Sequence, residues 1–352
     1  MVEKSCEVFF MEQQGKKKNK GCLIAIGCML AVVALVLGLA VSAYNSILNK
    51  IPRVDPDNEI TLSEEEIQAI ERETDPAGEI PEDATIVEEE MTMPPEEAVL
   101  IENEDHIINI LFIGQDRRPG EGRQRSDSMI LCTINTQEKT LVMTSFLRDL
   151  YVGIPDWNGR SYMDNRLNSC YAFGGMGMLD LALKQNFGIQ VDHNIEVDFS
   201  GFKDIIELFG GVSIYLTQAE AEYMGGGLTE GVNYLTPEQA LTYSRIRYLD
   251  SDFGRTNRQR KVLTAMLNSV KDLSYDQLTN LVNNILPMIT TDMSNSDITG
   301  YMMEILPILS ELQVTTQHVP ASGTYSSVYI RGMAVLVPDF KANIAILKDT
   351  LS

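Results

Sequence analysis

The sequence has few of the residues on which most metal and nucleotide sites depend. Its three histidines lie far apart and match no HExxH or Cys/His zinc spacing. Its five cysteines form no CxxC pair, so an iron–sulfur or thioredoxin-like site is not supported. It contains neither a GxxxxGK[ST] loop nor a GxGxxG loop after a strand. These absences exclude several common classes of enzyme that bind zinc, iron–sulfur clusters or nucleotides.

Basic residues are outnumbered by acidic ones, and the negative charge is distributed unevenly along the chain. The 352 residues include 28 Lys and Arg against 50 Asp and Glu, a net charge of −22. Residues 51–105 alone carry −18, whereas residues 1–50 carry +3 and residues 106–352 carry −7. Nucleic-acid binding needs Lys and Arg to displace counterions from phosphates, so we expect no nucleic-acid partner. The acidity belongs mostly to one short segment.

Residues 21–44 form a long run without a charged side chain. As a helix this run would be about 36 Å long, enough to cross a hydrocarbon core of about 30 Å. Four lysines lie just before it, so the positive-inside rule predicts a cytoplasmic tail at residues 1–20 and an extracellular remainder. The run is too long for a cleaved signal peptide. We therefore expect a single-pass protein of the cell membrane.

Residues 45–105 are predicted to be a disordered, solvated stalk. Most of this segment is rich in Glu, Asp, Pro and Thr and poor in aromatic residues, so it cannot bury enough apolar area to offset its ordering entropy. Within it, Ser63 and the glutamates that follow predict a short helix around Leu62–Glu73.

Residues 106–352 alternate between strand and helix patterns. Short, β-branched-rich runs predict buried strands at Ile107–Ile113, Met129–Ile134, Thr140–Phe146, Val212–Leu216 and Val314–Pro320. Helical spacing predicts helices at Gly177–Phe187, Phe199–Phe209, Thr236–Tyr243, 255–272, 274–312 and Asp339–Thr350. We therefore predict one α/β domain, with a mixed central sheet and helices on both of its faces. Its two cysteines, Cys132 and Cys170, have apolar neighbours and are interpreted as free buried thiols, with a disulfide as the alternative.

Arginines are concentrated at two places in this domain. The groups are Arg117, Arg118, Arg123, Arg125 and Arg148, and then Arg245, Arg247, Arg255, Arg258 and Arg260. Guanidinium groups bind phosphate oxygens through paired hydrogen bonds. Most of these residues lie where strands end and loops or helices begin, which is where open α/β sheets place ligands. The alternative is a set of surface salt bridges.

Aspartates accompany both arginine groups, at Asp116, Asp127, Asp149, Asp250 and Asp252. They can be simple ion-pair partners, or they can hold Mg²⁺, which prefers one or two carboxylates plus phosphate oxygens. A site with both arginines and a carboxylate-bound cation suits a pyrophosphate, because it neutralises the leaving group.

Seven stretches in order are similar to those of the LytR-CpsA-Psr (LCP) family of envelope enzymes. They are NILFIGQDRR (109–118), GRQRSDSMILCTIN (122–135), SFLRDLYVGIP (145–155), NSCYAFGG (168–175), VDFSGFKDIIELFGGV (197–212), LTPEQALTYSRIRY (235–248) and DFGRTNRQRKVL (252–263). The sequence departs from the family at Leu147, where a proline is usual, and at Asn168-Ser169-Cys170, which replaces an alanine-rich stretch. Neither departure removes a charged residue, so we expect activity to be retained.

The resemblance implies an α-β-α domain that binds a glycan linked to polyprenyl pyrophosphate outside the membrane. It implies transfer of the glycan phosphate to a sugar hydroxyl of peptidoglycan, as in teichoic acid or capsule attachment. The implied Mg²⁺ ligands are Asp116 and Asp127, and the implied pyrophosphate ligands are Arg118, Arg125, Arg148, Arg245, Arg247, Arg255 and Arg258, with Gln259 nearby. Arg148, Asp149 and Asp252 are the implied catalytic residues, and either aspartate could accept the hydroxyl proton.

A lipid-linked donor also needs an apolar slot. The residues we expect to line one are Leu179, Leu183, Phe187, Phe199, Phe202, Ile206 and Phe209, with ordinary core packing as the alternative.

Two other functions stay open. One is a pyrophosphatase that acts on the same lipid. The other is an envelope regulatory protein or transcriptional attenuator, which the lack of a DNA-binding motif disfavours. The sequence leaves open which polymer is transferred and the oligomeric state.

Overall fold

The computed structural model describes residues 44–56, 62–72, 84–87, 100–101, 104–115, 123–271 and 273–351. The chain divides into two compact units, residues 1–50 and 51–352. In the first unit, residues 44–48 are helical, whereas the predicted cytoplasmic tail and nearly all of the predicted span lie outside the described residues. Among the described helices, none is long and apolar enough to cross a membrane. The tail, the span and the membrane location therefore stay predictions.

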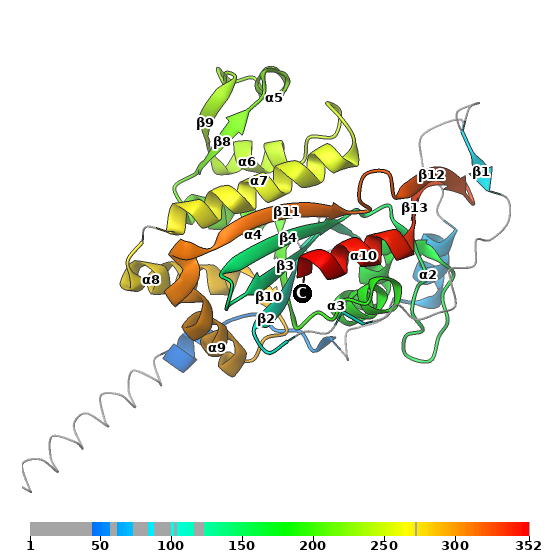
Figure 1. The fold of residues 1–352 in the computed structure, drawn as a ribbon, viewed down its shortest axis with the longest axis horizontal. Coiled ribbons are helices and arrows are strands. Elements are labelled where there is room, and N and C mark those ends of the chain that lie inside the picture. The colour runs from blue at the N-terminus through cyan, green and yellow to red at the C-terminus, as the bar shows by residue number, and fades with distance from the viewer. Residues whose placement is uncertain are drawn as a thin grey trace, which may run out of the picture. The chain divides into compact units, whose positions relative to one another are not determined.

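A six-stranded mixed sheet forms the centre of the second unit (Figure 1). Its strand order is β10 (Thr290–Thr291), β7 (His193–Asp198), β2 (Ile107–Gln115), β3 (Ser126–Asn135), β4 (Thr140–Phe146) and β11 (Gln313–Val319). The consecutive strands β2, β3 and β4 are antiparallel, while β7 joins β2 and β11 joins β4 in parallel. The predicted mixed sheet is confirmed.

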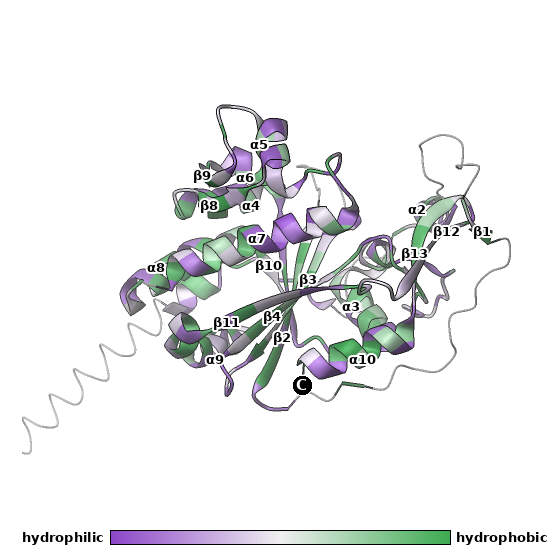
Figure 2. Cartoon of the chain, turned by 45° about the horizontal axis from the view of Figure 1, so that its top comes forward, coloured by the Kyte–Doolittle hydropathy of each residue, from purple (hydrophilic) through white to green (hydrophobic). Residues whose placement is uncertain are grey.

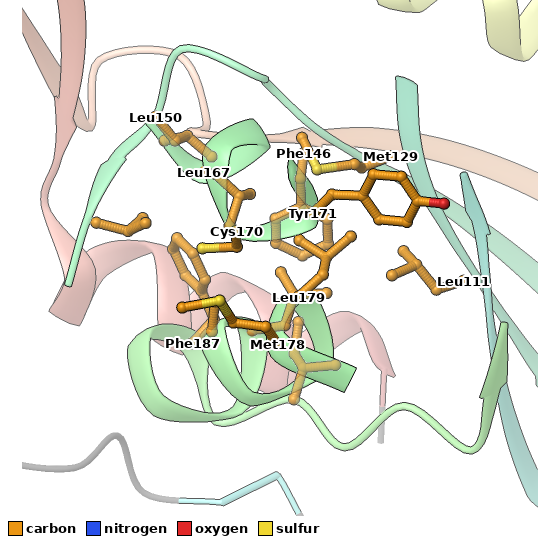
Figure 3. Close-up of a cluster of buried hydrophobic side chains, with 14 of the residues drawn as sticks. Leu111, Met129, Phe146, Leu150, Leu167, Cys170, Tyr171, Met178, Leu179 and Phe187 are labelled. Atoms are coloured by element: carbon orange, nitrogen blue, oxygen red, sulfur yellow. The ribbon is translucent and has the colours of Figure 1, made fainter. Parts of the chain in front are cut away.

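Alternate residues of β2 and β3 face two different layers of helices. Leu111 and Met129 belong to a buried cluster with helices α3 (Leu167–Phe187) and α10 (Phe340–Leu351), as Figure 3 shows for α3. Phe112 and Ile130 face the opposite way, toward α4 (Phe199–Leu208), α6 (Pro237–Ser244) and α7 (Asp252–Val270). Figure 2 shows α7 and α3 on different sides of the sheet. The predicted arrangement of helices on both faces is therefore confirmed.

Three small sheets accompany the central sheet in the described residues. β8 (Val212–Leu216) pairs with β9 (Gly231–Leu235) beside α5 (Gln218–Met224), and so the predicted strand at 212–216 lies outside the central sheet. β12 (Tyr325–Ile330) pairs with β13 (Met333–Pro338) and with β1 (Ile86–Val87). A third pair, β5 (Tyr151–Val152) and β6 (Asn165–Arg166), lies between β4 and α3 in the chain.

The predicted helical stretch 274–312 is interrupted. It consists of α8 (Tyr275–Ile285), a short 3₁₀ turn at Leu286–Met288, the edge strand β10, α9 (Asn295–Ile305) and a second 3₁₀ turn at Leu306–Glu311. Each 3₁₀ turn carries a proline near its start, and proline cannot donate the hydrogen bond that continues an α-helix. Cys132 and Cys170 are both free and buried, as predicted.

The described part of the acidic segment is not a solvated stalk, which corrects the prediction. Helix α2 (Glu64–Glu71) begins with Ser63 in a capping box, as predicted, but its Ile67 is buried in the α3 cluster together with Ile101. Strand β1 pairs with β12. Composition averaged over the whole segment concealed these few apolar residues, each of which has an acidic neighbour or two in the chain.

Candidate active site

A bulge at the start of β3 sets the position of Asp127. Gly114 of β2 pairs with Ser128 and Gln115 with Ser126, so Asp127 is an extra residue with no partner across the strand pair. Such a bulge re-aims the side chain that it carries, and bulges are common beside active sites. A Cβ atom on Gly114 would lie 3.1 Å from the Ser128 Cβ, so glycine allows the close approach here.

Three arginines from separate parts of the chain converge on the Asp127 carboxylate. The Arg148 Nη1 donates to Asp127 Oδ1 at 3.0 Å from the loop after β4, and the Arg247 Nη2 donates at 3.3 Å from the loop between α6 and α7. The Arg255 Nη1, in the first turns of α7, lies 3.9 Å from the same oxygen. The structure thus joins the two arginine groups of the sequence at one carboxylate.

Two further aspartates extend this network. Asp252, the first residue of α7, places its Oδ1 2.7 Å from Arg255 Nη2 and 3.8 Å from Arg148 Nε. Asp149 places one carboxylate oxygen 3.5 Å from Arg148 Nε and the other 3.4 Å from Arg166 Nε. Four arginines and three aspartates therefore lie side by side.

Two guanidinium groups of this network, those of Arg255 and Arg148, have buried hydrogen-bond donors that the described residues leave unused. Arg255 is only 2% exposed, and among the described residues none of its three nitrogens has a hydrogen-bond partner, because its close contact with Asp252 lacks hydrogen-bond geometry. The buried Nε of Arg148 also has none. A buried donor without a partner is costly, and an oxyanion ligand would satisfy it with a charge-assisted bond. The site therefore has the character of an anion-binding site.

Burial and neighbouring charge shift the pKa values in opposite directions. Burial raises the pKa of Asp252 above its usual value, although Arg255 and Arg148 oppose that shift. Burial likewise lowers the pKa of Arg255. For Arg148, burial would lower the pKa, but Asp149, Asp252 and Asp127 together raise it. The network thus contains one carboxylate that takes up a proton more readily than an exposed aspartate does.

An apolar cavity of about 120 Å³ adjoins the network. Its lining includes Phe112, Ile130, Phe199, Phe202, Leu241 and Leu263, with Ser128, Ser244 and Gln259 among its polar members. Ser128 follows Asp127 directly and donates from Oγ to Gln259 Oε1 at 3.0 Å, and Gln259 lies one helical turn after Arg255. The Arg245 guanidinium stacks over the Phe199 ring at 4.4 Å. Charged and apolar surfaces therefore meet along β3 and α7.

Most of the predicted charged site residues that the structure describes fall into this region, but Arg258 does not. Arg258 lies apart in a separate ion-pair cluster, where it donates to Glu220 at 2.8 Å and to both oxygens of Asp250 at 3.0 and 2.7 Å. Because its donors are occupied, the structure gives Arg258 a structural role rather than the predicted ligand role. Arg125 lies directly before β3, while Asp116 and Arg118 lie outside the described residues.

The predicted lipid-pocket residues divide between the two faces of the sheet. Phe199 and Phe202 line the cavity. Leu179, Leu183 and Phe187 instead pack in the α3 cluster, where Figure 3 shows Leu179 and Phe187. Ile206 is buried beneath β8 and β9, and Phe209 follows the end of α4. The packing of the α3 residues fits the alternative of ordinary core, because helical spacing identifies an apolar face but not the side of the sheet that it covers.

Some contributors to the site were missed in the sequence. Arg166 in β6 bonds the Ala334 carbonyl at 2.8 Å as well as contacting Asp149, and neither of the two arginine groups included it. The bulge at Asp127 was also missed, since only the strand register reveals it. Among the described residues, no group of three or more His, Cys, Asp or Glu side chains could hold a metal ion.

Comparisons with known proteins complete the description. The profile of the LytR_cpsA_psr family matches residues 79–348. The polyisoprenyl-teichoic acid–peptidoglycan teichoic acid transferase TagU of Bacillus licheniformis is 35% identical over 202 residues, which cover 55% of this chain and 64% of that protein. TagU of Bacillus mycoides is 34% identical over 194 residues, covering 53% and 61%. The matched segment thus spans less than two thirds of these curated relatives.

Solved structures show the same fold. TagT bound to LIIa-WTA superposes with a TM-score of 0.56 at 25% identity, covering 73% of this chain and 95% of that one. Bacillus subtilis TagV superposes with a TM-score of 0.57 at 24% identity, covering 71% and 97%.

Proposed function

The chain belongs to the LytR-CpsA-Psr family, and we propose that it is a membrane-anchored extracellular phosphotransferase. It would move a glycopolymer phosphate, such as that of a teichoic acid or capsule, from a polyprenyl-pyrophosphate carrier to a peptidoglycan sugar hydroxyl. The curated relatives named above are transferases from teichoic acid to peptidoglycan, which supports this choice of donor and acceptor.

The observation that carries the proposal is the convergence of Arg148, Arg247 and Arg255 on Asp127 at the edge of an apolar cavity. A lipid-linked pyrophosphate has both an anionic group and an apolar tail, and this site offers a surface for each. At about 120 Å³ the cavity is smaller than ordinary ligand pockets of about 300–1,000 Å³. The lipid would therefore have to widen it, and the half-buried Phe202 on α4 lies in its wall.

The chemistry follows from the positions of the charged groups. The acceptor oxygen would attack the phosphorus that bears the glycan, and the bond from that phosphorus to the bridging oxygen would break. Polyprenyl phosphate would then leave. The three guanidinium groups would stabilise the negative charge that builds up on the phosphate oxygens. Asp149 or Asp252 would take the hydroxyl proton, and the raised pKa of Asp252 favours it as the base.

The family resemblance also implies Mg²⁺, and Asp127 is the described residue that fits it. Among the described residues, the three arginine contacts of Asp127 go to its Oδ1, which leaves Oδ2 to face a cation. Mg²⁺ commonly uses one or two carboxylates together with substrate phosphate oxygens. We propose Asp127 and Asp116 as its ligands. The cation would neutralise charge on the pyrophosphate.

The test compares Arg148→Lys and Arg148→Ala with the wild-type chain. Lysine keeps the charge but loses the planar fork that binds two phosphate oxygens, so we expect transfer to fall about 100-fold or more in both variants. The measurement is the transfer of a labelled glycan from its polyprenyl-pyrophosphate carrier to peptidoglycan oligomers. Arg160→Lys is the matched control, because Arg160 pairs with Glu64 and Glu71 of α2 instead.

Full transfer by both Arg148 variants would rule out the proposed site. Release of the glycan phosphate to water alone, with none joined to peptidoglycan, would identify a pyrophosphatase instead. Absence of any turnover by the wild-type chain with intact donor and acceptor would leave a regulatory role.

A further inference from the structure

A second hollow adjoins the charged network, separate from the apolar cavity. This groove has a volume of about 590 Å³ and lies between the β12–β13 hairpin and the start of α7. Asp149 and Asp252 line its near end, together with Ser251 and Phe253. The hairpin is attached directly to the network, because the Leu336 N–H of β13 donates to the Asp149 carbonyl at 2.9 Å.

One face of β12 lines this groove. Tyr325, Ser327 and Tyr329 alternate along the strand and share that face, and Val328, which belongs to a buried cluster with Tyr151, also borders the groove. The centre of the Tyr325 ring in β12 lies 5.4 Å from the centre of the Phe253 ring in α7. This aromatic pair joins the strand wall of the groove to its helix wall. The groove thus presents rings beside hydroxyl groups.

The charge of the groove distinguishes it from the donor site. Its described lining contains two carboxylates and no Lys or Arg, whereas the donor side has Arg148, Arg247 and Arg255. A pyrophosphate would be repelled there, but a sugar could stack its apolar ring face on the tyrosines and donate its hydroxyls to Asp149 or Asp252. The lining therefore suits a neutral, hydroxyl-bearing glycan.

We propose that this groove binds the acceptor glycan and selects which sugar hydroxyl reacts. The inference rests on the proposed function. The cavity proposed for the lipid and the groove proposed for the acceptor adjoin different aspartates of one network. The cavity is lined by Ser128, the neighbour of Asp127, and the groove is lined by Asp149 and Asp252. In-line displacement needs the attacking and leaving oxygens on opposite sides of the phosphorus, and two separate surfaces meet that need. The hydroxyl oxygen bonds to phosphorus, polyprenyl phosphate leaves, and the proton passes to one of the two carboxylates.

The test uses Ser327→Trp in the full chain, which fills the groove from an exposed position of β12. The expected result is a loss of about tenfold or more in kcat/KM for peptidoglycan oligomers, with unchanged affinity for the polyprenyl-pyrophosphate donor. Ser326→Trp is the matched control, since Ser326 is the same residue type, exposed, and on the opposite face of the same strand. Thermal unfolding of both variants verifies that they fold.

Tyr329→Ala is a second test, which removes a ring from the groove instead of adding a bulky side chain. We expect this variant to raise the KM for the acceptor. The inference fails if Ser327→Trp and Tyr329→Ala both transfer like the wild type. It also fails if Ser327→Trp weakens donor binding as much as acceptor use, because the groove would then belong to the donor. A wild-type chain that binds the donor but transfers to no glycan would overturn the proposed function, and this inference with it.

Discussion

Two neighbouring arginines on α7 show how differently a buried charge can be accommodated. Arg258 is 3% exposed, and its guanidinium is held by Glu220 and Asp250. Arg260 is 4% exposed, but within the described part of the chain its guanidinium meets only the Ser145 hydroxyl, at 2.6 Å. Burial lowers the pKa of Arg260 to about 10, a sign that its charge is poorly compensated.

We therefore predict opposite effects on stability when each is replaced by methionine. Arg260→Met removes an uncompensated charge and should raise the free energy of unfolding by about 1–2 kcal/mol. Arg258→Met leaves Glu220 buried without its partner and should lower it by about 3–5 kcal/mol. Chemical denaturation at neutral pH measures both. Equal losses in the two variants would contradict this account.

The loss in Arg258→Met should depend on pH. Although burial alone would raise the pKa of Glu220, hydrogen bonds from the Thr217 N–H and from Arg258 hold it below its usual value. A lowered carboxylate pKa stabilises the folded state above the unfolded pKa, and that contribution is lost as the pH falls through the folded pKa. The difference between wild type and Arg258→Met should therefore shrink in acid.

At the scale of elements, the sequence predicted the central strands better than it predicted which face each helix covers. β2, β3 and β4 were evident from their apolar runs. The two groups of arginines were evident as well, but that Arg148 and Arg255 meet at Asp127 is a finding of the structure. The division of the lipid residues between α3 and α4 was not evident, because both helices are apolar and only the register of β2 decides which side each covers. β12 was missed because its short run mixes Ser with Tyr and Val, and β13 was missed although its run, MAVLVP, is apolar.

The cavity between α7 and the sheet leads to a prediction at this scale. Leu263 lines the cavity, and its neighbour Thr264 lines a groove on another side of the same helix. Leu263→Trp should fill the cavity and weaken binding of a long-chain polyprenyl-pyrophosphate donor about tenfold or more. The affinity for a water-soluble analogue without the lipid should stay within about twofold, since an apolar pocket contributes only to the lipid. Calorimetric titration of each ligand measures this.

Thr264→Trp is the matched control for that experiment and should bind both ligands normally. Equal weakening of the lipid-linked and the lipid-free ligand in Leu263→Trp would show that the substitution disturbs the arginine network rather than a lipid site. Unchanged binding of the long-chain donor would place the lipid elsewhere.

At the scale of the whole molecule, the described part of the acidic segment packs against the folded domain. Ile67 of α2 is 3% exposed and packs in the same cluster as Leu111, Phe173 and Leu179. Arg160 ties the same helix to the domain through Glu64 and Glu71. The negative charge around α2 therefore does not keep this helix in solvent, because Ile67 is buried and Leu62 and Ile70 pack against the same cluster.

Substitution of two isoleucines in this segment tests that conclusion. Ile67→Ala removes buried apolar area and leaves a cavity, so we expect it to lower the free energy of unfolding by about 2–4 kcal/mol. In a domain of about 150–250 residues, each kcal/mol lost from the free energy of unfolding lowers the Tm by about 2–4 °C. Ile86→Ala is the matched control, since Ile86 lies in β1 of the same segment but is 57% exposed, and its effect should stay within about 0.5 kcal/mol. Calorimetry of the full chain measures both, and an equally small effect of the two substitutions would restore the solvated stalk that composition alone predicts.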